Sequence, residues 1–188
     1  ITALGDGAFA AKSLRAPKLA AVSFGDGSSV LGTNTFFGQR ALKDVKLSAE
    51  QEKLEEIGAG VFAYCTALKS LPVKPVVAGD YAFAGCSALT LDLSAIERAG
   101  AGAFRGCKAL TATLDKLENA GDYAFADCSA LGVINLASAV EIGEGAFKNC
   151  AKINVSDINE NLKKIGKCAF YKTGIEAEPF SIPSGVEE

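Results

Sequence analysis

Apolar residues recur in a fixed order along this chain, separated by polar or small residues. The clearest copy runs from Ile142 to Ile153 and reads Ile-Gly-x-x-Ala-Phe-x-x-Cys-x-x-Ile. Its phenylalanine recurs at intervals of 21 to 27 residues, at Phe9, Phe36, Phe62, Phe83, Phe104, Phe125, Phe147 and Phe170. Self-similarity over such a period is typical of a solenoid, in which stacked repeats bury a shared core.

Each repeat is expected to contribute one short strand and one helical turn. A short apolar-polar-apolar segment follows the pattern and predicts a strand, at residues 22–24, 45–47, 71–73, 91–93, 112–114, 134–136 and 180–182. Strands that recur once per coil in the same direction predict a parallel sheet. The phenylalanine, cysteine and leucine, spaced by three, predict a helical turn. The repeat glycine is expected at a corner that needs a positive φ.

The predicted fold is therefore an α/β solenoid of about eight repeats. A solenoid is one continuous stack without an internal boundary, so residues 1–188 are expected to form a single domain. Repeats within residues 1–50 are longer and looser, and those within residues 51–188 are more regular.

Two columns of side chains are expected to form the core. The first is the phenylalanine series, and the second consists of Cys65, Cys86, Cys107, Cys128 and Cys150. Equivalent residues of stacked coils lie about 4.8 Å apart with parallel side chains, which keeps their Cβ atoms beyond the usual range of a disulfide. We therefore interpret these cysteines as buried thiols. Cys168 lies outside the column.

Composition excludes several functions. With no histidine in the chain, Ser-His and Cys-His nucleophile pairs are absent, and no Cys-x-x-Cys or phosphate loop is present. No catalytic, cofactor-binding or metal-binding residues are therefore predicted. The net charge of −3 gives no footprint for nucleic acid, and no apolar run approaches the ~18 residues of a membrane span.

The remaining candidate site is a surface row. If the polar residues between the apolar strand positions point outward, they form a row along a concave sheet, made of Ser23, Lys46, Asp92, Thr113, Asn135 and Ser181. Solenoids bind partners on such extended faces. The alternative is that these residues only keep the surface soluble.

The phrases Ile-Gly-Glu-Gly-Ala-Phe-Lys-Asn-Cys and Ala-Phe-Tyr-Lys-Thr-Gly-Ile resemble the signature of the BspA-like leucine-rich-repeat family, over residues 4–186. The resemblance implies a right-handed leucine-rich-repeat superhelix found in bacterial surface or secreted adhesins that contact host matrix or serum proteins or other bacteria. The family has no common catalytic residues. The compressed 21-residue repeats depart from its pattern.

These observations favour a non-catalytic protein-binding module, outside the cell or on its surface, whose protein partner is unidentified. Contact with nucleic acid or membrane is not expected. The segment contains no secretion leader, so any targeting signal is expected outside it. The alternative is a structural spacer or scaffold that positions a neighbouring domain.

Overall fold

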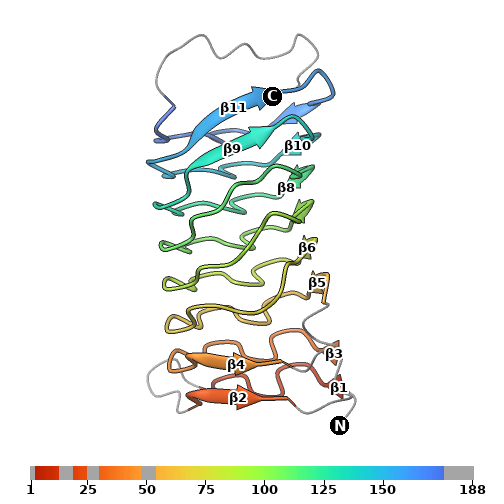
Figure 1. Ribbon diagram of the computed structural model, residues 1–188, viewed down its shortest axis with the longest axis vertical. Coiled ribbons are helices and arrows are strands. Elements are labelled where there is room, and N and C mark those ends of the chain that lie inside the picture. The colour runs from red at the N-terminus through yellow and green to blue at the C-terminus, as the bar shows by residue number, and fades with distance from the viewer. Residues whose placement is uncertain (1–2, 13–18, 25–29, 48–53, 176–188) are drawn as a thin grey trace.

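The computed structural model describes residues 3–12, 19–24, 30–47 and 54–175. In this part, the chain winds into coils stacked along one long axis, with the amino-terminal coils at one end (Figure 1). Every paired strand runs parallel to its neighbour. The predicted solenoid is confirmed. No described residue lies in a helix, however, so the α/β class and the helical turn are wrong.

The longest sheet, which we call the lateral sheet, has six strands of two residues each. They are β5 (Glu56–Ile57), β6 (Val77–Ala78), β7 (Arg98–Ala99), β8 (Asn119–Ala120), β10 (Glu141–Ile142) and β12 (Lys164–Ile165). A separate pair, β1 (Ala3–Leu4) and β3 (Val30–Leu31), precedes them. These strands lie directly before the repeat glycines, where the sequence analysis predicted no strand. Two residues are too few to show a strand period.

The predicted strands form only in part. The front face, as we call it, carries β2 (Ala21–Ser23) paired with β4 (Asp44–Lys46), and β9 (Val133–Leu136) paired with β11 (Asn154–Ile158) (Figure 1). Segments 71–73, 91–93 and 112–114 lie between these pairs and form no strand, and 180–182 falls outside the described residues. The prediction of one sheet through every coil is therefore wrong. Strands form on this face only in repeats longer than 21 residues, since the shorter repeats leave less chain there.

The turn side, from the repeat glycine to the following leucine, consists of linked turns. Tyr81, Phe83 and Gly85 donate their N–H groups to carbonyls of the next coil at 2.7–2.8 Å. Between them, Ala84 bonds three residues back to Tyr81 at 3.1 Å. Tyr81 and Gly85 have φ angles of 56° and 72°. Because a right-handed helix needs φ near −63°, these left-handed residues exclude it.

The repeat glycines are required for close approach between coils. A Cβ atom on Gly100 would lie 2.7 Å from the backbone nitrogen of Asp80, and one on Gly121 would lie 2.8 Å from that of Ala101. Neither glycine has a positive φ. The prediction that these corners need positive φ is therefore wrong, because steric contact with the preceding coil selects glycine here.

The phenylalanine rings form one continuous stack through the core. Neighbouring rings from Phe9 to Phe170 have centroids 5.1–5.6 Å apart and planes within 3–11° of parallel. The rings between them are fully buried, whereas Phe9 is 42% exposed and Phe170 is half-buried. The lateral sheet takes one strand from each of six coils. The predicted count of eight repeats is therefore not confirmed.

The cysteine column lies beside this stack. All six cysteines are free; the five of the column are buried and Cys168 is exposed. Each thiol of the column donates a hydrogen bond of 3.0–3.2 Å to the phenylalanine carbonyl of the preceding coil. In the repeat that lacks the cysteine, Gln39 donates from Nε2 to the carbonyl of Phe9 at 2.6 Å. The interpretation as buried thiols is consistent with this arrangement.

Candidate binding site

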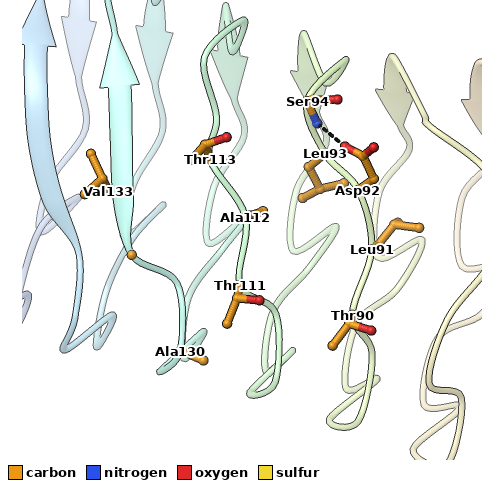
Figure 2. A pocket seen from close by; sticks show the side chains of 11 residues that line it. Thr90, Leu91, Asp92, Leu93, Ser94, Thr111, Ala112, Thr113, Ala130 and Val133 are labelled. Carbon is orange, nitrogen blue, oxygen red and sulfur yellow. Dashed lines mark hydrogen bonds between the residues drawn. The ribbon is translucent and has the colours of Figure 1, made fainter.

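An open groove of about 700 Å³ crosses the front face in the middle of the stack (Figure 2). It is lined by residues 90–94 and 111–113 and, in the next coil, by Ala130, Gly132 and Val133. The groove coincides with the 21-residue repeats, whose front segments do not pair. Leu91 and Leu93 are buried and anchor their segment to the core. Asp92, which lies between them, consequently faces outward.

The groove exposes backbone groups. Thr90 donates its N–H to the carbonyl of Lys69 at 2.7 Å, and the N–H of Ser94 bonds to Oδ1 of Asp92 at 3.0 Å. Within the described residues, no bond is recorded for the N–H groups of residues 91–93 or 111–113. These N–H groups are therefore available to hydrogen-bond with water or with a bound partner.

Side chains make the lining mixed in polarity. Figure 2 shows Thr111 and Thr113 on one segment and Asp92 on its neighbour. Val133, at the start of β9, is 52% exposed and supplies an apolar contact. Hydroxyl groups both donate and accept hydrogen bonds, so the groove can pair with a partner's peptide groups in either sense.

Asp92 forms an ion pair with Lys74. Nζ of Lys74 lies 2.8 Å from its Oδ2, and Ser94 bonds to its Oδ1. The hydrogen bond from Lys74, followed by those from Ser94, holds the pKa of the Asp92 carboxyl well below its usual range. The groove lining therefore includes an acidic side chain whose charge is balanced by Lys74, which lies outside the lining.

The residues of the predicted row do not form one continuous surface in the structure. Ser23 lies beside Lys46 in the register of β2 and β4, and Asp92 and Thr113 both line the groove. Asn135 is half-buried, and its side-chain oxygen accepts the N–H of Ala137 at 2.7 Å. Ser181 lies outside the described residues. Whether these residues bind a partner stays a prediction.

The sequence analysis missed several lining residues. Thr90 and Thr111 each follow the last leucine of the repeated pattern, at equivalent positions. This recurrence is the signal that could have identified them. Val133 had no comparable signal, and neither had Lys74, which lies outside the lining and pairs with Asp92 from the preceding coil.

A second groove, of about 390 Å³, lies over the lateral sheet. Its lining includes repeat glycines and charged residues of successive strands. Glu141 of β10 and Lys164 of β12 are neighbours in its register.

Metal-binding clusters and membrane-spanning helices are both absent from the described residues. No group of three or more His, Cys, Asp or Glu residues there could hold a metal ion. Among the same residues, no helix is long and apolar enough to cross a membrane.

The repeated pattern that forms these coils matches a known protein family. The model of the BspA type leucine rich repeat region matches six copies, over residues 1–111 and 76–188. The chain belongs to this family. No curated protein matches the BspA-type chain.

Two solved structures show the same fold. A leucine-rich repeat protein from Bacteroides ovatus is 22% identical, with a TM-score of 0.76 over 94% of this chain and 46% of its own. The T. pallidum leucine-rich repeat protein is 24% identical, with a TM-score of 0.60 over 76% of this chain and 66% of its own. The BspA-type chain thus spans less than half of the Bacteroides protein's length.

Proposed function

We propose that this chain is a non-catalytic protein-binding module that contacts its partner through the front face. The supporting observation is the open groove, where two neighbouring front segments carry N–H groups that form no hydrogen bond within the described part of the chain. A partner's peptide groups can pair with them at little cost, because the backbone is already fixed by buried leucines. The rigid coils present this surface in one shape.

The proposal includes the cellular location of the protein and its role in adhesion. Membership in the BspA-type family supports a place on or outside a bacterial cell, and adhesion to host matrix or serum proteins or to other bacteria. The shallow, mixed lining favours a broad polar contact with a protein over a small-molecule pocket, which is usually enclosed and mostly apolar.

A second candidate function is a structural spacer. The uninterrupted ring stack from Phe9 to Phe170 supports it, because it joins all described coils into a stiff rod. A spacer would hold a neighbouring domain at a distance and bind nothing itself.

Retention of host proteins on the immobilised chain, followed by affinity measurements with each purified partner, tests the proposal. Thr113→Arg places a bulky side chain in the groove, and Thr33→Arg makes the same change at an exposed position in another coil. We expect Thr113→Arg to weaken binding about tenfold or more, as changes at the centre of an interface do. Thr33→Arg should bind like the parent.

Circular dichroism melting should show that both variants are folded. Equal affinities for Thr113→Arg and the parent would remove the front face from the proposal. Failure of the folded parent to retain any matrix, serum or bacterial surface protein would favour the spacer.

A further inference from the structure

Charge is distributed unevenly along the stack. Residues 54–147 contain eleven acidic and six basic residues, whereas residues 148–175 contain only Asp157 and Glu160 against six lysines. The lysines are Lys148, Lys152, Lys163, Lys164, Lys167 and Lys172. The overall net charge of −3 conceals this reversal. One end of the described stack is therefore basic while its middle is acidic.

The lysines of the last described coil follow its outer surface. Lys163 precedes β12, Lys164 begins it, Lys167 follows the repeat glycine, and Lys172 lies on the turn side; all four are exposed. None of the six lysines forms an ion pair within the described part of the chain. Unpaired like charges in one region produce a potential that attracts anions over about 8–10 Å at physiological salt.

An exposed aromatic ring lies among these charges. Tyr171 is 49% exposed, and Nζ atoms of Lys148 and Lys172 lie 5.7 and 5.4 Å from its ring centroid. The ring offers a flat apolar surface flanked by two positive charges. Such a combination suits a ligand that carries anionic groups around an apolar sugar face.

We propose that this basic end, made of the six lysines and Tyr171, is a binding surface for a sulfated polysaccharide. Lysine acts as a point charge and does not form the two-pronged contacts that arginine makes with single carboxylates or phosphates, so a row of lysines fits a chain of repeated anionic groups. Tyr171 is the only large apolar side chain exposed at this end of the described residues, which is too little for the apolar core of a protein interface.

The acidic middle of the stack limits how the polyanion can lie. Glu141 neighbours Lys164 across β10 and β12, so the sign of the surface changes within one coil. A long polyanion along the stack would meet the carboxylates of preceding coils. Binding is therefore expected to involve a short stretch of the polysaccharide at the end of the stack. The surface is separate from the front groove, so the proposal does not rest on the proposed function.

The test measures binding of the full chain to a heparin oligosaccharide by biolayer interferometry at 50–300 mM salt. One variant replaces Lys163, Lys164, Lys167 and Lys172 with glutamine. The matched control replaces the exposed Lys43, Lys69, Lys108 and Lys116 with glutamine, which changes the net charge equally in other coils. We expect a loss of about tenfold or more and a shallower salt dependence in the first variant, and at most about a threefold loss in the control.

Three further arms distinguish the polysaccharide from other anions. Desulfated heparin, poly-glutamate and vesicles with anionic lipid should each bind at least about tenfold more weakly than heparin. Glu176→Gln/Glu178→Gln should leave heparin binding unchanged or strengthen it, because it removes negative charge that directly follows the basic end in the sequence. Equal losses in the two lysine variants, no binding of the folded parent at 150 mM salt, or equal binding of any alternative anion would overturn the proposal.

Discussion

The thiol of Cys107 donates a hydrogen bond to the carbonyl oxygen of Phe83 in the preceding coil, with the sulfur 3.2 Å from that oxygen. The same carbonyl accepts the N–H of Cys86 within its own coil at 3.0 Å. The Phe83 carbonyl oxygen thus accepts two hydrogen bonds, and the one from the Cys107 thiol links two coils without a disulfide. The same bond recurs through the column, and Gln39 supplies its equivalent in the repeat without the cysteine.

This arrangement predicts one reactive thiol out of six. Burial raises the pKa of the Cys65 and Cys150 thiols to about 12, and it also raises the pKa values of Cys86, Cys107 and Cys128. Only the thiolate reacts rapidly. Ellman's reagent at pH 8 should therefore label one thiol in the native chain and all six in guanidinium chloride. Rapid native labelling that persists in Cys168→Ser would contradict this.

The same burial predicts a loss of stability in alkali. A folded-state pKa raised above the ordinary value near 9 means that the unfolded chain loses protons first, so the free energy of unfolding falls as pH rises from about 9 toward 12. Each buried thiol contributes up to about 1.4 kcal/mol per pH unit to this slope. Urea unfolding at pH 8 to 11 measures it.

Cys150→Ala serves as the control for the alkaline slope. Lysine and tyrosine residues titrate in both chains, so the difference between them isolates one thiol. The variant should show a smaller decrease of unfolding free energy with pH. An unchanged slope would mean that burial of this thiol does not couple its proton to folding.

Phe104→Ala should cost about 3–5 kcal/mol of unfolding free energy. The ring is fully buried and stacks on Phe83 and Phe125, at 5.3 and 5.1 Å between centroids. Its removal forfeits contacts on both faces and leaves a cavity. Urea denaturation of parent and variant gives the difference.

Phe9→Ala is the comparison for the ring stack. Phe9 contacts one ring of the column, Phe36, and is 42% exposed. We expect less than about half the cost of Phe104→Ala, since the loss scales with buried area. Equal costs at the two positions would contradict the view that each ring is stabilised by its neighbours.

Gly100→Ala should destabilise the stack by about 1–3 kcal/mol, the usual cost of overpacking. The added Cβ would lie 2.5 Å from Oδ1 and 2.7 Å from the backbone nitrogen of Asp80. Gly132→Ala is the matched control, because no atom lies within 4 Å of its added Cβ and its φ is not positive. Its melting temperature should stay within a few degrees of the parent. Equal shifts in the two variants would exclude close approach as the reason for glycine.

Predictions from residue spacing within one repeat were wrong where contacts between coils determine the backbone conformation. The spacing of three between Phe83, Cys86 and Leu89 predicts a helical turn, yet Tyr81 and Gly85 adopt left-handed conformations. Those conformations turn every second N–H toward the next coil, and a single repeat contains no information about a partner in its neighbour. The helix prediction was wrong for this reason.

The candidate site was predicted in part for the same reason. Alternation of apolar and polar residues correctly placed Asp92 and Thr113 on the exposed side of their segments, because their leucine neighbours are anchored in the core. The ion pair between Asp92 and Lys74 depends on the distance between two front segments that form no strand. The groove depends on the same spacing. These distances are set by repeat length acting across several coils.

The sequence by itself determined that the chain stacks, since a phenylalanine that recurs every 21 to 27 residues cannot be buried within one repeat and must contact its copies. It also determined which side chains form the core columns. Only the tertiary structure decided where the strands lie, why the corners contain glycine and where the front face opens. These features arise from hydrogen bonds and steric contacts between residues about 21 positions apart, which no local pattern encodes.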